Sequence, residues 1–425
     1  MRKVITFFLA FILFASSIGV VSANNENGDR AEENTRYWQQ TQLLLALGIL
    51  DSTYTSFNQP QSTLSVGIVR TVLSNFTGFP EEFTERSSIT FGKTVELMIQ
   101  TLGYHMIMDI EEVSDSAYLS KGAELGLTKG ALKKTDELIT SESFVQMLVN
   151  MLDIEMLKPY ATEKDAVRFE ARETFLQSQN IEKRSGIVEA TSITRLGSIE
   201  RTNSGYVMID KIIYDVGVTN ASDLLGYFTE FYVRDTGQED HGVLLYITEK
   251  ESNESIVVKA EDIQSNTDIE KISYYDREKD KEQKARLNVD FYLAYNGVTT
   301  LKKSLDLLKP ERGHLRLLDN NGDGSYDVVF VTSYEIDVIS GVDSTQSTIY
   351  LKNSNAALDL SDEKKIIKFQ KNNEPSSLEM LREDDIIYLA KSKSGGYISI
   401  EASDSKVSGV VCEIRQEDHY NYCVI

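Results

Sequence analysis

The sequence has few of the residues that build disulfide frameworks, zinc sites or histidine-dependent active sites. Only two cysteines and four histidines occur among its 425 residues. Two cysteines cannot form a multi-disulfide framework or a four-cysteine zinc site. No His-x-His or His-Glu-x-x-His pair, which would hold a metal, occurs among His105, His241, His314 and His419. We therefore expect packing, rather than covalent or metal links, to stabilise the fold.

Motifs of the common enzyme classes are missing as well. No Gly-x-Ser-x-Gly, P-loop or Gly-x-Gly-x-x-Gly sequence occurs, so acyl transfer and nucleotide binding have no sequence anchor. Acidic pairs such as Glu81-Glu82 and Glu111-Glu112 resemble glycosidase carboxylates. Among 66 acidic residues such pairs arise by coincidence and more often belong to a solvated face. We expect a protein that is not an enzyme.

Positive charge is scarce relative to negative charge. The 44 Lys and Arg residues face 66 Asp and Glu residues, which gives a net charge of −22. This surface repels phosphates and anionic lipids, so we expect neither nucleic acid nor a bare bilayer as a partner. With 41% hydrophobic and 26% charged residues, the composition is that of a globular protein rather than a polytopic membrane protein or a disordered chain. The length predicts two to four domains.

The N-terminus has the features of a secretory signal peptide. Arg2 and Lys3 precede an apolar run over 4–21, and Val21-Ser22-Ala23 matches the small-residue pattern of a cleavage site. We expect residues 1–23 to be removed on export, which leaves no membrane association. A retained membrane anchor is the alternative, because the run is nearly long enough to span a bilayer. The polar residues 24–36 read as an acidic linker.

Residues 37–160 show a helical periodicity that repeats. Ile89-Thr90 opens an amphipathic segment that ends at a glycine, and Ile139-Thr140 opens a similar segment fifty positions later. A weaker copy begins at Leu64-Ser65. Such repetition is typical of stacked helical units that share a core, so we expect an all-α helical repeat domain. Residues 161–185 are predicted to form a connecting helix.

These segments, with "AYLSKGAELGLTKG" before "LITSESFVQMLVNML", resemble degenerate S-layer homology domains of Gram-positive surface proteins. The resemblance covers residues 37–160 and lies in pattern more than identity. It implies three repeats packed with pseudo-threefold symmetry, whose grooves hold the pyruvylated secondary polymer of the cell wall. The counterparts of the family signature Ile-Thr-Arg-Ala-Glu begin at Ile89, Ile139 and Leu64, and all lack its arginine. The resemblance therefore implies either a wall-binding module or a structural remnant.

After Gly186 the periodicity changes to short β-branched and aromatic runs, separated by Asn, Gly, Ser and Asp. Such runs are typical of antiparallel barrels or sandwiches. We expect a small β-domain, a β middle section, a second small β-domain and the start of an incomplete β-module, over 186–263, 264–338, 339–406 and 407–425. The expected fold class is thus multidomain, with an all-α S-layer-homology-like helical repeat domain followed by all-β small barrel or sandwich modules.

The phrases "RSGIVEATSITRL", "YLAYNGV" and "DNNGDGSYDVVFVTSYE" are similar to large S-layer-homology-containing surface proteins of Firmicutes. In that family the β-modules have no assigned catalytic role. The resemblance implies an exported, non-catalytic protein of the S-layer or cell wall, with β-modules as spacer or interaction units. Its partners would be the secondary polymer of the cell wall or other envelope proteins. The alternative is the anchoring and spacer part of a secreted enzyme whose catalytic module lies beyond residue 425.

One loop has the residues of a calcium site. Asp319, Asn321, Asp323 and Asp327 place oxygen side chains at positions 1, 3, 5 and 9, with Gly322 among them and a second glycine at position 6. Phe330 stands where an EF-hand has its bidentate Glu, so the loop more closely resembles those between strands of calcium-binding β-repeats. The alternative is a simple hairpin turn, because Asn-Gly and Asp-Gly favour positive φ.

The two cysteines lie close together in the sequence near residue 425. Cys412 and Cys423 are equidistant from Glu417-Asp418, so a hairpin that turns there would place them directly opposite each other. An exported chain meets an oxidising environment that allows a disulfide. Against a bridge, Glu-Asp is a poor two-residue turn, and the two cysteines can instead pack as small apolar residues.

Overall fold

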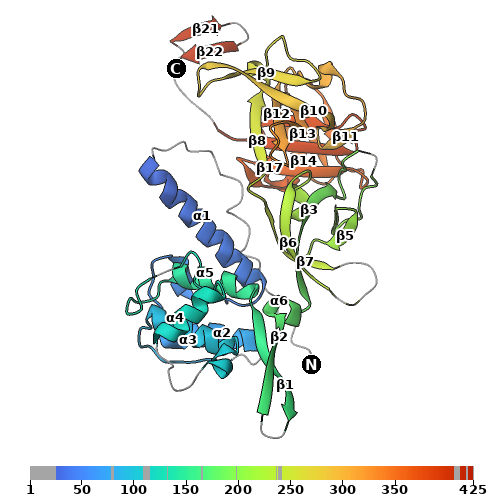
Figure 1. Ribbon diagram of the computed structural model, residues 1–425. Coiled ribbons are helices and arrows are strands. Elements are labelled where there is room, and N and C mark those ends of the chain that lie inside the picture. The colour runs from blue at the N-terminus through green and yellow to red at the C-terminus, as the bar shows by residue number, and fades with distance from the viewer. Residues whose placement is uncertain are drawn as a thin grey trace. The chain divides into compact units, whose positions relative to one another are not determined.

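The computed structural model describes residues 25–77, 81–108, 115–131, 133–163, 166–197, 199–235, 237, 242–405, 412–417 and 420–424. Contacts divide the chain into two compact units, Met1–Ile181 and Glu182–Ile425 (Figure 1). The expected signal peptide over 1–23 lies outside the described residues. Within the described ranges, no helix is both long enough and apolar enough to cross a membrane.

Three amphipathic helices form the core of the first unit. The unit contains α1 (Asn25–Ala46), α2 (Val66–Ser74), α3 (Phe91–Thr101), α4 (Asp115–Glu124), α5 (Ser141–Leu152), β1 (Glu155–Glu163), β2 (Ala166–Thr174) and α6 (Phe175–Ser178). The side chains of Ser65, Thr90 and Thr140 cap α2, α3 and α5 by accepting a backbone N–H three residues on. The apolar faces of these helices are buried, as at Val69, Val95, Met98, Val145 and Leu148.

The helix starts are tied together by extended backbone. Antiparallel bridges join Thr63 to Thr140, Ser65 to Ser88, and Thr90 to Leu138. Each cap residue therefore lies in a short β-pairing as well as at a helix terminus. The first unit therefore contains short strand pairings as well as helices.

The expected all-α helical repeat domain is wrong. The chain is mostly β, with 38% strand against 23% helix, and no helical repeat domain is evident in the described part. Residues 155–174 form the hairpin β1–β2, paired from Glu155 opposite Thr174 to Glu163 opposite Ala166. Hydrophobic periodicity indicates the amphipathic helices, but it carries no signal for the extended backbone that pairs between and after them.

The connecting helix expected over 161–185 is also wrong. The described residues of this stretch lie mostly in β1, β2 and β3, and α6 is the one helix among them. The apolar residues of β2 alternate with charged ones, which is the period of a strand: Val167, Phe169 and Ala171. Pro159, just upstream in β1, is incompatible with a helix interior.

The acidic linker expected over 24–36 lies, from Asn25 onward, in α1. The linker interpretation rested on the lack of apolar residues in this segment. Its Ala, Glu and Arg residues are nevertheless good helix formers, and the helix continues to the apolar end of α1.

The second unit contains three β-modules in succession. The first β-module is a closed barrel in the order β3-β4-β5-β7-β6. Its strands are β3 (Ile181–Ala190), β4 (Tyr206–Ile209), β5 (Ile212–Asp215), β6 (Phe228–Arg234) and β7 (Val243–Glu249).

The second β-module is a sheet in the order β11-β10-β13-β12-β8, with β9 paired to β10. Its strands are β8 (Glu254–Lys259), β9 (Lys271–Asp276), β10 (Lys281–Tyr295), β11 (Val298–Thr300), β12 (Gly313–Asp319) and β13 (Tyr326–Ser333). Strand β8, which lies in the segment expected as the first small β-domain, thus pairs with β12 of this second sheet.

The third β-module is a sheet in the order β16-β15-β14-β19-β20-β17-β18. Its strands are β14 (Glu335–Asp343), β15 (Thr348–Leu351), β16 (Ala357–Asp359), β17 (Ile366–Lys371), β18 (Glu374–Pro375), β19 (Ile386–Lys391) and β20 (Tyr397–Ser403). A hairpin of β21 (Glu413–Glu417) and β22 (Tyr420–Val424) follows in the sequence.

The three β-modules repeat one strand topology. A 3₁₀ helix precedes a hairpin in each: η5 (Ala221–Asp223) before β6–β7, η7 (Leu305–Leu307) before β12–β13, and η8 (Leu378–Met380) before β19–β20. The second strand of this hairpin pairs in parallel with an earlier strand, as β7 with β5, β13 with β10, and β20 with β17. The first strand of the hairpin lies beside the first strand of the module.

A short sequence pattern marks the repeated 3₁₀ helices. An acidic residue is followed by two apolar ones at Asp223-Leu224-Leu225, Asp306-Leu307-Leu308 and Glu379-Met380-Leu381. The last residue of each triplet is buried. The acid faces solvent at the turn, and the final leucine anchors the turn in the core of the module or at its edge.

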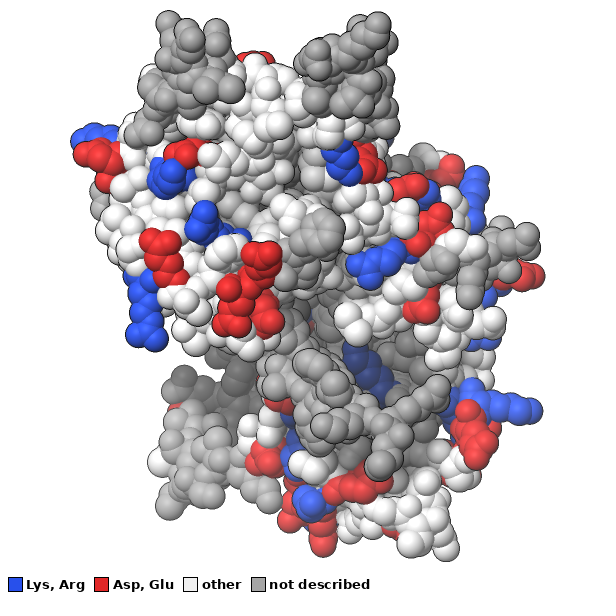
Figure 2. Space-filling view, turned by 90° about the horizontal axis from the view of Figure 1, so that it is seen from below, with Lys and Arg blue, Asp and Glu red and all other residues white. Residues whose placement is uncertain are grey.

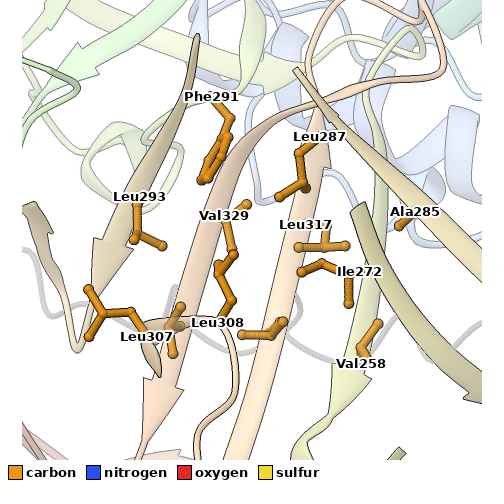
Figure 3. Packing of buried hydrophobic residues seen from close by; sticks show 12 residues of the cluster. Val258, Ile272, Ala285, Leu287, Phe291, Leu293, Leu307, Leu308, Leu317 and Val329 are labelled. Carbon is orange, nitrogen blue, oxygen red and sulfur yellow. The ribbon is translucent and has the colours of Figure 1, made fainter. Parts of the chain in front are cut away.

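The core of the second β-module is formed by apolar side chains from five of its strands and from the 3₁₀ helix η7 and the residue after it. Figure 3 shows Phe291, Leu293, Leu317 and Val329 side by side on three neighbouring strands, with Leu308 from the loop before β12. All of these residues are at most 2% exposed. Comparable apolar clusters fill the first and third β-modules.

A polar and apolar junction joins the first two β-modules. The Nη1 of Arg316 donates to Tyr227 Oη over 2.7 Å, and its guanidinium lies 4.0 Å from the ring centre of Phe330. Beside it, the Nδ2 of Asn320 donates to the carbonyl of Gly226 over 2.8 Å. Four buried apolar residues complete the contact: Leu196, Leu225, Leu318 and Val328.

Asn296 joins the second and third β-modules. It adopts a positive φ of 45° at the turn between β10 and β11, and it is 6% exposed. Its Nδ2 donates to the carbonyls of Ser333 and Lys391, each over 2.8 Å, and its Oδ1 accepts the Ser333 N–H over 2.7 Å. Next to it, Gly297 has no room for a Cβ, which would lie 2.5 Å from the ring of Tyr397.

We expect Asn296→Ala to destabilise the second unit by about 1–3 kcal/mol, because buried carbonyl and N–H groups lose their partners. Asn355→Ala is the matched control, since Asn355 also has a positive φ, of 51°, but is exposed. Urea unfolding, monitored by far-UV circular dichroism, measures the free energy of unfolding of both variants. Equal losses in the two variants would mean that only backbone strain at positive φ is involved.

A buried carboxylate fixes the loop after β15 in the third β-module. Asp337 accepts backbone N–H groups from Val338, Asn353 and Ser354, and the Ser354 hydroxyl at 2.6 Å. Burial acts to raise the pKa of Asp337, but these hydrogen bonds outweigh it and lower the pKa to about 2. The ionised carboxylate therefore stabilises the folded state.

This contribution should be lost in acid. Because the folded pKa is depressed, the stabilisation is complete above the ordinary value of 3.8 and disappears as the pH falls through about 2. Ser354→Ala should raise the pKa of Asp337 and move acid unfolding to higher pH. Ser361→Ala is the control, because Ser361 donates to the exposed Asp359. Unfolding midpoints measured over a pH series test this expectation. If Ser354→Ala unfolds in acid at the same pH as the original protein, the stabilising role given to the Ser354–Asp337 hydrogen bond is wrong.

Candidate functional site

The Asp-rich loop connects β12 to β13 in the second β-module. Asp319 ends β12 and is 1% exposed, whereas Asn321 and Asp323 at the tip are exposed. Asp327 lies at the start of β13 and is half-buried. Gly322 and Gly324 have φ of 75° and 81°, the conformation that Gly adopts most readily. The structure therefore places the four predicted ligands in one loop but at different depths.

Asp319 organises the backbone of the loop. Its Oδ1 accepts the N–H groups of Asn321 and Gly322, and its Oδ2 accepts that of Gly324 over 2.8 Å. Toward the tip, Asn321 Oδ1 accepts the Asp323 N–H, and Asp323 Oδ1 accepts the Ser325 N–H. A chain of side-chain to backbone hydrogen bonds thus holds the turn.

Negative charge accumulates around Asp327. Its carboxylate accepts the Asn320 N–H and the Asn288 Nδ2, each over 3.1 Å. Burial raises the pKa of Asp327, and the charges of Asp319 and Asp323 raise it further. Among the described residues, no Lys or Arg forms an ion pair with these three acids. A cation in the loop would relieve this repulsion.

The geometry of the loop is not that of an assembled metal site. Within the described ranges, no group of three or more His, Cys, Asp or Glu side chains is placed to hold a metal ion. The carboxylate oxygens of Asp319 and Asp323 face backbone N–H groups, although each oxygen has a second lone pair. The residue types fit a hard cation, and the hydrogen-bonded turn is complete without one.

Sequence reasoning missed two residues of this region. Asn320 is 7% exposed and reaches out of the loop to Gly226 of the first β-module. Asn288, on β10, donates to Asp327 from 39 positions away. Neither residue occupies a position in the calcium pattern, and no local spacing signals a partner on another strand.

Among the described residues, the other candidates do not assemble into a site. His314 is partly buried on β12, and burial and the charge of Arg316 lower its pKa. Glu81 and Glu82 are exposed, as a solvated face requires. Three candidate positions lie outside the described residues: His241, His419 and the pair Glu111-Glu112.

The cysteine hairpin forms in a register different from the expected one. Cys423 lies opposite Ile414, and Glu417 lies opposite Tyr420, so the strands flank 418–419 rather than 417–418. Cys412, which is exposed, precedes β21 and is not directly opposite Cys423. Diagonal neighbours in an antiparallel pair lie about 7–8 Å apart, which is beyond ordinary disulfide geometry.

Neither the protein-family models nor the curated proteins compared with this sequence give a match.

Proposed function

We propose that the protein is an exported, non-catalytic component of the cell envelope, associated with the S-layer or cell wall. In this proposal the three β-modules form a spacer that holds the N-terminal unit and other envelope partners apart. The secondary polymer of the cell wall or other envelope proteins are the partners. The observation that carries the proposal is the repetition of one β-topology with specific contacts between successive modules.

The junctions support a spacer because specific side-chain contacts join each β-module to the next. Arg316 and Asn320 link the first β-module to the second through hydrogen bonds to the Tyr227 hydroxyl and to the buried carbonyl of Gly226. Asn296 links the second β-module to the third, because its side-chain amide donates both to the carbonyl of Ser333 in the second module and to that of Lys391 in the third. Flexible linkers of Gly and Ser would instead leave modules independent.

The surface charge is compatible with a location outside the cell. Figure 2 shows acidic and basic side chains interspersed on one face of the molecule. The net charge of −22 keeps such a protein soluble and disfavours contact with anionic lipids. The S-layer homology pattern in 37–160 is the reason to assign wall attachment to the N-terminal unit.

The experiment is co-sedimentation of the full mature protein with purified cell-wall sacculi. We expect the protein to pellet with intact sacculi and to stay in solution once the secondary polymer is extracted. Bovine serum albumin of similar acidity controls for trapping. Failure to pellet with intact sacculi would contradict wall attachment, and pelleting that survives extraction would assign it to peptidoglycan instead.

We further propose that the Asp-rich loop binds Ca²⁺ through Asp319, Asn321, Asp323 and Asp327. The accumulation of negative charge around Asp327 supports this, because a divalent cation would offset the charge repulsion that adds to burial in raising the pKa of this carboxyl. The ligands are oxygen atoms, as Ca²⁺ requires. Binding would fix the tip of a loop whose second residue, Asn320, touches the first β-module.

Saturating Ca²⁺ should raise the melting temperature, since a ligand at 100 times its Kd adds about 2.7 kcal/mol to the folded state. Asp323→Ala should abolish this shift. Asp362→Ala is the matched control, because Asp362 is exposed and accepts one backbone N–H as Asp323 does. Differential scanning calorimetry at constant ionic strength measures the effect. An equal shift in Asp323→Ala would indicate screening of the acidic surface.

A further inference from the structure

The sequence contains three Asn-Gly pairs, and the fold places them in three different environments. In such a pair the glycine nitrogen can attack the side-chain amide carbon of the asparagine, because the glycine has no Cβ to hinder the approach. Asn27-Gly28 lies in α1, Asn296-Gly297 lies between β10 and β11, and Asn321-Gly322 lies at the tip of the Asp-rich loop. Both residues of this last pair are exposed to water.

The backbone nitrogen of Gly322 is held against a carboxylate. Its N–H donates to Asp319 Oδ1 over 2.7 Å, and Asp319 is 1% exposed. A general base takes up a proton over about 2.6–3.2 Å, so this carboxylate is within reach of the proton that must leave before the nitrogen can attack. The second oxygen of Asp319 accepts the Gly324 N–H, which keeps the carboxylate in place at the end of β12.

The side-chain amide of Asn321 is oriented by the same loop. Its Oδ1 accepts the N–H of Asp323 over 2.9 Å. Negative charge develops on this oxygen when a nucleophile adds to the amide carbon, and a fixed N–H at about 2.7–3.1 Å stabilises that charge. Because Asn321 is exposed, water can donate a proton to the departing nitrogen.

The Asn-Gly pair between β10 and β11 is held in the opposite way. Asn296 is 6% exposed, its Nδ2 donates to the carbonyls of Ser333 and Lys391, and its Oδ1 accepts the Ser333 N–H. Attack on this amide would break all three hydrogen bonds in a site from which water is largely excluded. The fold therefore protects Asn296 and exposes Asn321 to reaction.

We propose that Asn321 is a site of self-modification, at which the Asp-rich loop converts its own asparagine to aspartate and isoaspartate. The Gly322 nitrogen bonds to the side-chain carbon of Asn321, its proton passes to Asp319, and the Cγ–Nδ2 bond breaks. The departing nitrogen takes a proton from water and leaves as ammonia, which gives a cyclic succinimide. Water then opens the ring at either carbonyl, so the reaction needs no oxidant and no other reactant.

The two products change the loop in different ways. Aspartate adds a carboxylate to a turn that is already acidic. Isoaspartate adds a carbon atom to the backbone at position 321, directly after Asn320, whose side chain donates to Gly226 of the first β-module. The modification therefore acts beside a junction between two β-modules. It requires neither the envelope role nor the Ca²⁺ binding proposed above.

The experiment is peptide mapping by mass spectrometry after the full mature protein is incubated at mildly alkaline pH, with a chelator and heavy-oxygen water. We expect Asn321 to lose its amide nitrogen and take up heavy oxygen at least about tenfold faster than Asn296. A synthetic peptide of residues 315–329 gives the rate without the fold. The folded loop should react about threefold faster than this peptide, because the reacting groups are already in place. A folded loop that reacts no faster than the peptide would overturn the proposal.

Asp319→Asn separates a catalytic carboxylate from a structural one. This variant removes the proton acceptor but keeps an oxygen for the hydrogen bonds of the loop, so the reaction at Asn321 should slow about tenfold. If Asp319 only holds the turn, the loosened loop would react as fast as the original protein or faster, and the proposal would be wrong. Asp343→Asn is the control, because Asp343 also accepts two backbone N–H groups but lies in the third β-module. It should leave the rate at Asn321 unchanged.

Discussion

The parallel strand pair in each β-module is the interaction on which the second unit depends. In each case it joins two strands separated by a 3₁₀ helix and the first strand of a hairpin. Parallel pairing of this kind requires a crossover, and here the 3₁₀ helix supplies the turn of that crossover. Once the pair forms, the hairpin is brought beside the first strand of the module, and the apolar faces of all strands meet in one core.

The composition of the modules was easier to predict than their pairing. Short β-branched and aromatic runs identified the strands, because a strand with one buried face alternates in sequence. They could not identify which strands pair. Residues 254–259 sit next to β7 in the sequence, yet β8 joins β12, some 60 positions further on, because its Val258 packs into the second core.

In the N-terminal unit the helices were predictable, but the extended segments were not. Periodicity located the amphipathic segments and their hydroxyl caps at Thr90 and Thr140. It also suggested helices where the chain is extended, since a few apolar residues among charges satisfy a helical and a strand period equally over short stretches. Pro159 and the alternation in β2 were the local signals that distinguish the two.

The candidate site was predictable as a list of residues but not as an arrangement. The spacing of Asp319, Asn321, Asp323 and Asp327 is visible in the sequence. Their division into a buried organiser, an exposed tip and a half-buried acid follows from where β12 ends and β13 begins. The contacts of Asn320 and Asn288 depend on strands that only the tertiary fold brings near.

The length of β10 lets this strand pair with two partners in the second β-module. This strand has 15 residues, of which Lys281–Arg286 pair with β9 and Tyr292–Tyr295 pair with β13. Between the two halves the register shifts, and Val289 is 88% exposed, as at a bend. The bend directs β9 along the first half of β10, and β9 also bridges the chain just after β8, where Tyr274 lies opposite Ile263, as β4 and β15 pair with the end of the first strand of their modules. One topology is thus kept in the three modules, and in the second the length of a single strand lets β10 pair with β9 along one half and with β13 along the other.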